Sequence, residues 1–136
     1  MDRDEDYIIA LCDEVLGETA LRQHKLPFLL GDANSTGARR HLPVDAYYPQ
    51  RNLVIEYREL QHSQPVAIMD KRVTLSGVNR AEQRRKYDQR RRDVLAAYEI
   101  KLIELDYSLF AHDRKKRLVR ELEADTQVVR ERLLTF

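Results

Sequence analysis

Apolar residues recur at helical spacing near both ends of the chain, and between these ends they follow strand-like patterns. Residues 5–16 carry their apolar side chains on one stripe, which predicts an amphipathic helix that Gly17 ends. Residues 113–135 show the same spacing with charge on the opposite side, which predicts a second amphipathic helix. Residues 79–98 predict one long helix that is polar in its first half and apolar in its second.

Shorter segments rich in β-branched, aromatic or other apolar residues predict strands. These strands are residues 26–30, 42–48, 52–60 and 101–107. A further short strand is predicted around residues 66–69, whereas residues 31–40 have the composition of an exposed loop.

The order of these elements predicts an α/β fold with one mixed sheet. Short turns join the first three strands, so we expect them to be antiparallel. The last strand follows a crossover helix, so we expect it to pair in parallel. Helices then pack on the sheet, and residues 1–136 are enough for a single domain.

Composition narrows the class of protein further. Apolar residues make up 43% of the chain and charged residues 35%, which is typical of a soluble globular protein. No apolar run approaches the roughly 18 residues of a membrane span. The acidic N-terminus lacks the basic segment of a signal peptide, and the single Cys12 excludes an intrachain disulfide and a thiolate zinc site. We therefore expect a cytoplasmic protein without a membrane partner.

The net charge of +1 conceals a strong asymmetry along the chain. Residues 1–18 contain seven acids and one base, whereas residues 79–93 contain seven bases and three acids. Such a separation predicts one face that can bind a polyanion.

Two carboxylates, Asp45 and Glu56, lie on the strands that the Pro49-Gln50-Arg51 link joins. If the turn is centred between Gln50 and Arg51, the two residues are directly opposite, with Cβ atoms about 4.5–5.5 Å apart. Like charges there destabilise a hairpin, and a divalent cation between them removes the repulsion. The alternative is that Asp45 begins a turn and Glu56 pairs with an arginine such as Arg58.

The segment HLPVDAYYPQRNLVIEYRELQH resembles the strand–turn–strand core of PD-(D/E)xK nucleases over about residues 42–62. It is most similar to the branch of small Vsr-like and homing-type endonucleases, written roughly as D-x-Y-x-P followed by L-x-I-E-Y-x-x-x-Q-H. The resemblance implies a restriction-endonuclease-like αβββαβ core, here with an extra C-terminal helix. It also implies that Asp45 and Glu56 bind Mg²⁺, for which Mn²⁺ can substitute.

The sequence departs from this family at Arg58, which stands where a lysine is usual. Arginine can bind a phosphate but does not lose its proton, so it cannot act as a base. In the branch that this chain resembles, a Gln-His pair follows the glutamate, here Gln61 and His62. His62 would share a strand face with Glu56 and orient or deprotonate the attacking water. The alternative for His62 is a surface histidine at a strand end.

The long helix carries Gln83 and Tyr87, which are four residues apart and share a face. This pair is similar to the Q-x-x-x-Y element of RecB-like nucleases, which faces the active site. The same face continues to Arg80, Arg84 and Arg91, which are suited to bind phosphates. The alternative is a solvated helix face held together by ion pairs between residues four apart.

A helix glutamate often completes such metal sites. Glu14 and Glu18, on or just after the first helix, are the candidates, and the alternative for each is a plain surface position.

Taken together, these residues predict a Mg²⁺-dependent nuclease that hydrolyses DNA phosphodiesters. The main alternative is a non-catalytic nucleic-acid-binding module, which the missing lysine favours. A third possibility is an interaction protein that forms a homodimer through its last helix. Packing of residues 119–136 on the chain's own sheet explains their apolar repeat equally well.

Overall fold

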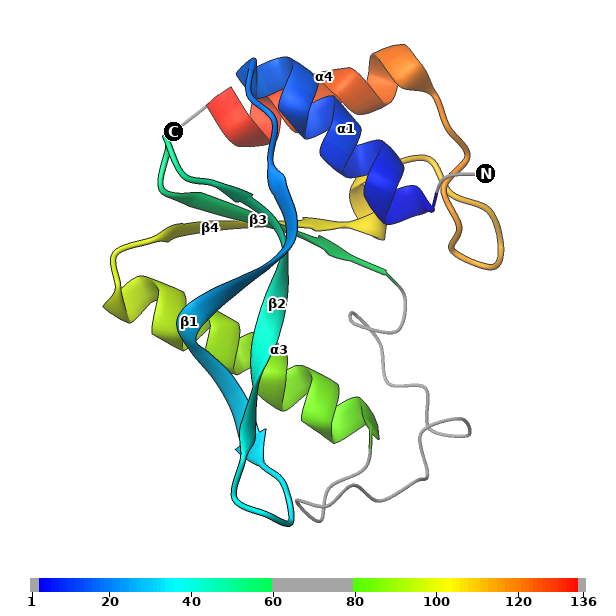
Figure 1. The fold of residues 1–136 in the computed structure, drawn as a ribbon. Coiled ribbons are helices and arrows are strands. Elements are labelled where there is room, and N and C mark those ends of the chain that lie inside the picture. Colours follow the sequence, from blue (N-terminus) through cyan, green and yellow to red (C-terminus); the bar gives the residue numbers. More distant parts are fainter. Residues whose placement is uncertain (1–2, 60–79, 135–136) are drawn as a thin grey trace.

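Four strands form one mixed sheet in the computed structural model, which describes residues 3–59 and 80–134 (Figure 1). Their order is β1-β2-β3-β4; the first two pairs are antiparallel, and β3 and β4 are parallel, as the connections predict. The strands are β1 (Leu21–Ala33), β2 (Arg39–Tyr48), β3 (Leu53–Arg58) and β4 (Lys101–Asp106).

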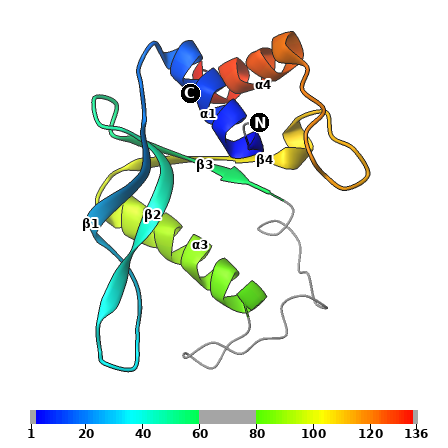
Figure 2. The ribbon, with the colours of Figure 1, turned by 45° about the vertical axis from the view of Figure 1, so that its right-hand side comes forward.

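Helices cover both faces of this sheet. On one face lie α1 (Asp4–Leu16) and α4 (Leu122–Leu134), and on the other lies α3 (Arg80–Ala97) (Figures 1 and 2). The described part of the chain is therefore an α/β fold with a four-stranded mixed sheet flanked by three helices. Each face has its own apolar cluster, and burial of these two clusters holds the layers together.

The expected helices and strands differ from the observed ones mainly at β1 and β2. Only residues 26–30 were expected in the first strand, and residues 31–40 were expected to form a loop, but the β1–β2 ladder reaches Ala33 and Arg39. The turn between them is held by Asn34, whose side-chain oxygen accepts the backbone N–H groups of Thr36 and Ala38. Pairing with a partner strand thus extends both strands through polar sequence. The strand expected around residues 66–69 lies outside the described residues.

The last helix begins at Leu122, not at residue 113 as the apolar spacing predicts. The Asp113 carboxylate accepts the backbone N–H groups of Lys115 and Arg117, which stabilises a turn instead of a helix. Val129 and Leu133 of α4 are buried in the cluster that α1 also lines. Packing within the chain therefore accounts for part of the apolar repeat, and the homodimer stays a prediction.

The two-stranded ribbon of β1 and β2 twists near Asp45, so that it packs against one apolar cluster before this residue and against the other after it. Ala46 packs in the cluster on the α1 face, whereas Val44, two residues away, packs in the cluster on the α3 face. Residues two apart share a face in a regular strand, so β2 changes its inward face at Asp45. Gln23 lies opposite, between the paired residues of β1, and has a left-handed backbone with φ of 48°. The left-handed backbone of Gln23 therefore lies opposite one of the candidate metal ligands.

The ribbon approaches α3 closely at Gly31. The Tyr87 hydroxyl accepts the Asp32 backbone N–H at 3.0 Å, and a Cβ added to Gly31 would lie 3.1 Å from that hydroxyl and from Leu42 Cδ2. We expect Gly31→Ala to lower the free energy of unfolding by about 1 kcal/mol, because the extra methyl group forces the helix and ribbon apart. Urea denaturation measures this loss. The loss should be smaller in a Tyr87→Phe background, and an equal loss in both backgrounds would contradict this explanation.

Candidate active site

Asp45 and Glu56 are cross-strand neighbours on β2 and β3. The hairpin has the expected register, with Ala46 opposite Ile55 and Tyr47 opposite Val54. Both carboxylates line one cavity of about 190 Å³. The alternative that Asp45 begins a turn is wrong, because Asp45 lies within β2.

The two carboxylates are held by each other's backbone. The Asp45 N–H donates to Glu56 Oε2 at 2.6 Å, and the Tyr57 N–H donates to Asp45 Oδ2 at 2.8 Å. Side-chain oxygens thus accept amide groups of the opposite strand at the level where β2 turns over. This exchange positions both carboxylates by the sheet itself.

A third carboxylate, that of Glu5, reaches the same cavity from the first turn of α1. The amide nitrogen of Gln23 donates to Glu5 Oε2 at 2.8 Å and to Asp45 Oδ1 at 3.3 Å. One nitrogen bonded to both oxygens requires the two carboxylates to lie close together. Glu5 was not among the expected candidates, because its place in an acidic first turn is common to many helices.

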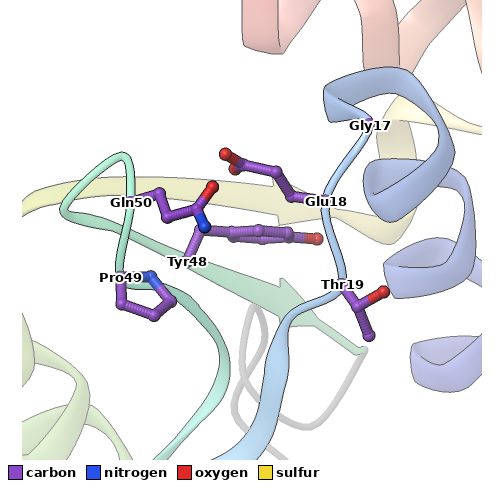
Figure 3. A pocket seen from close by; sticks show the side chains of 6 residues that line it. All are labelled: Gly17, Glu18, Thr19, Tyr48, Pro49 and Gln50. Atoms are coloured by element: carbon purple, nitrogen blue, oxygen red, sulfur yellow. The ribbon is translucent and has the colours of Figure 1, made fainter.

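The two helix glutamates that the sequence proposed lie elsewhere. Glu14 is exposed on α1. Glu18 bonds to Arg51 at 2.8 Å and lines a separate pocket with Tyr48 and Gln50 beside the β2–β3 turn (Figure 3). The structure brings neither of them to Asp45 and Glu56, so Glu5 takes the place in the cavity that Glu14 and Glu18 were expected to fill.

Burial and repulsion between neighbouring carboxylates disfavour the ionised forms of Glu56 and Glu5. Burial, followed by repulsion from Asp45, raises the pKa of Glu56 to about 8, although Arg91 and Arg58 lower it. The same two causes, burial first, raise the pKa of Glu5 to about 7. A neighbouring cation would relieve the strain on both groups.

Arg58 joins three elements at the position where the resemblance implies a lysine. Only 6% of its surface is exposed, and its guanidinium donates to Asp88 of α3 at 2.9 Å and to Glu104 of β4 at 2.5 Å. It also lies 3.7 Å from Glu56 Oε1, so the alternative that Glu56 pairs with Arg58 holds in the structure. Arg58 Nε is buried without a hydrogen-bond partner among the described residues.

The predicted phosphate-binding face of α3 is divided between two places. Arg91 turns inward, where its Nε lies 3.3 Å from Glu56 Oε1 and donates to the Pro43 carbonyl at 3.1 Å. Gln83 and Tyr87 share a face as expected, but they line a second groove rather than the carboxylate cavity. The expectation that this pair faces the carboxylates is therefore corrected.

Arg80 and Arg84 of α3 are not among the residues that line the carboxylate cavity. Arg80 is exposed at the start of α3, and Arg84 is half-buried one turn further on. Gln61 and His62 lie outside the described residues, so their expected roles stay predictions.

The oxygen donors of Glu5, Asp45 and Glu56 are of the type that Mg²⁺ prefers. Over residues 3–59 and 80–134, however, no three His, Cys, Asp or Glu side chains are already arranged to hold a metal ion. The Gln23 amide stands between two of these carboxylates instead. Binding of an ion therefore requires a local rearrangement of side chains.

Comparisons with protein-family models, curated proteins and solved structures find no match for this chain. In the part of the chain that the structure describes, no helix has the length and apolar character needed to cross a membrane.

Two arginines that bind the same Glu104 provide a matched test of the buried ion pairs. Removing Arg58 takes one buried cation from Asp88, which keeps Arg91 at 3.2 Å, and from Glu56, so we expect Arg58→Met to lower the free energy of unfolding by about 3 kcal/mol. Arg92 also bonds to Glu104, at 3.0 Å, but 43% of its side chain is exposed, so Arg92→Met should cost less than about 1 kcal/mol. Urea denaturation compares the two, and equal losses would contradict a structural role for Arg58.

The raised pKa of Glu56 predicts how stability depends on pH in metal-free protein. The folded state holds the proton more tightly than the unfolded chain, whose glutamate titrates near 4.5. This contribution is complete below about pH 4.5 and is lost as pH rises through about 8. We expect the Tm of wild-type protein to fall relative to that of Glu56→Gln between these values, as followed by circular dichroism in EDTA. Parallel pH profiles would contradict the raised pKa.

Proposed function

We propose that this chain is a Mg²⁺-dependent nuclease that hydrolyses phosphodiester bonds in DNA. The observation that carries the proposal is the meeting of Glu5, Asp45 and Glu56, from α1, β2 and β3, in one cavity. Acids crowded at a site that raises their pKa values are typical of functional sites. The resemblance of residues 42–62 to PD-(D/E)xK nucleases supports the same function, with a restriction-endonuclease-like arrangement of the sheet as part of the proposal.

The three carboxylates would hold the ion through their oxygens, in place of the Gln23 amide. A bound Mg²⁺ supplies activation of water and offsets the negative charge of the transition state. Asp45 and Glu56 keep their positions through the backbone amides that they accept. Arg91 lines the same cavity, and its guanidinium is suited to donate to a phosphate oxygen beside Glu56. Gln61 or His62 would position the water.

A non-catalytic nucleic-acid-binding module is the second candidate. The observation that favours it concerns Arg58, which stands where the family usually has a lysine. Arg58 hydrogen-bonds to Asp88 and Glu104, and an arginine cannot accept a proton from the attacking water. Such a module would bind DNA in a salt-sensitive way, and Asp45→Ala would leave that binding intact.

Cleavage of plasmid and single-stranded DNA in Mn²⁺ tests the nuclease directly. We expect Asp45→Ala and Glu5→Gln each to lower the cleavage rate by roughly 100-fold, because loss of even an indirect metal partner costs about 10–100-fold. Glu18→Gln is the matched control, because it makes the same change just after α1 at a residue outside the carboxylate cavity. This variant should retain the wild-type rate.

Three outcomes separate the candidates. Metal-dependent cleavage that Asp45→Ala and Glu5→Gln remove supports the nuclease. Absence of cleavage by wild-type protein, with intact DNA binding, supports the binding module instead. Equal losses in Glu5→Gln and Glu18→Gln would contradict the assignment of Glu5 to the site.

A further inference from the structure

A second and larger groove runs between the β1–β2 ribbon and the first half of α3. It encloses about 790 Å³. Its lining is mostly polar or charged and comes from both strands, the turn between them and α3. The side chains on which the following argument rests are those of Lys25, Asp32, Arg40, His41 and Gln83.

The charge of this groove is positive. Asp32 is its only acid within the described residues, and it is neutralised by Lys86 at 2.8 Å and Arg90 at 2.7 Å. Lys25 and Arg40 are both exposed, and neither forms an ion pair with another residue that the structure describes. Two cations therefore face solvent in a groove whose acid is already paired.

The basic residues of α3 contribute less free charge than their number suggests. Lys86 and Arg90 bind Asp32, Arg91 lies against Glu56, and Arg92 binds Glu104. The β1–β2 ribbon therefore supplies cations that are available to a polyanion, Lys25 from β1 and Arg40 from the start of β2.

The groove also adjoins the carboxylate cavity. Pro43 lines the groove, and its carbonyl accepts the Nε–H of Arg91, which lines the cavity. A chain-like ligand that lies along the ribbon would therefore pass Arg91 and reach Asp45 and Glu56. A small molecule bound in the groove alone would gain nothing from this connection.

We propose that this groove binds the sugar–phosphate backbone of a DNA strand, with Lys25 and Arg40 contacting phosphates, and directs the strand to the carboxylate cavity. The proposal rests on the proposed function, since it names the surface that delivers the substrate to that site. Lysine and arginine contacts to phosphate carry no base information, so binding here is independent of sequence. The amide of Gln83 and the ring of His41 are placed to add hydrogen bonds to the same backbone.

The test is fluorescence anisotropy of labelled duplex and single-stranded DNA in EDTA, where no metal-dependent cleavage occurs. The groove variant is Lys25→Gln with Arg40→Gln. The control is Arg114→Gln with Lys115→Gln, which removes the same charge from an exposed turn before α4. For duplex DNA, loss of two phosphate contacts should lower the slope of log K against log salt by about 2, over about 50–200 mM salt.

The groove variant should show this smaller slope and weaker binding, while the control keeps the wild-type slope. An unchanged slope in the groove variant overturns the proposal, and so does an equal change in both variants, because net charge alone would then explain binding. Cleavage in Mn²⁺ is scored separately. Cleavage without dependence of binding on the groove rejects the groove and keeps the nuclease, whereas groove-dependent binding without cleavage keeps the groove and rejects the nuclease.

Discussion

Burial of the Glu56 carboxylate is the constraint on which the site and its surroundings depend. An ionised group that is only 2% exposed is costly unless charges and hydrogen bonds compensate it. Here the compensation comes from the Asp45 N–H, from Arg91 on α3 and from Arg58 on the same strand. Arg58 in turn requires its own buried partners. The sheet and α3 are thus held in register by charge as well as by apolar packing.

The buried Glu56 can be interpreted in two ways, as part of a network of ion pairs that stabilises the fold or as part of a metal-binding site. Ion pairs that compensate Glu56 stabilise the protein without any metal, and they explain why Arg58 and Arg91 point inward. Yet Asp45 and Glu5 add two further acids to the cavity, where the Gln23 amide bridges them, the Tyr57 N–H donates to Asp45, and the exposed Arg3 pairs with Glu5 at 3.8 Å. A fold that needed only stability gains nothing from this crowding, because like charges raise the free energy of the folded state. This crowding of acids is what supports the proposed divalent cation.

The sheet separates the acidic helix α1 from the basic helix α3. The acids of α1 and the bases of α3 lie on opposite faces, so the central strands separate them (Figure 1). The carboxylate cavity lies where β2 turns over and side chains from both faces can meet. Glu5 arrives from one face and Arg91 from the other. Gln23, whose backbone is left-handed, lies opposite Asp45 at this twist of the ribbon. The twist therefore accounts for its unusual backbone conformation.

The sequence by itself determined the order of the elements, the mixed sheet and the register of the β2–β3 hairpin. Turn length and strand periodicity are local properties, and they suffice to place Asp45 opposite Glu56. Tertiary structure alone decided that Glu5, rather than Glu14 or Glu18, reaches that pair. It also decided that Arg91 turns inward. The late start of the last helix follows instead from local hydrogen bonds of Asp113, which the apolar spacing does not reveal. Periodicity orders side chains within one element, whereas the crossing of α1 over the sheet follows from packing of residues far apart in the chain, which no local pattern encodes.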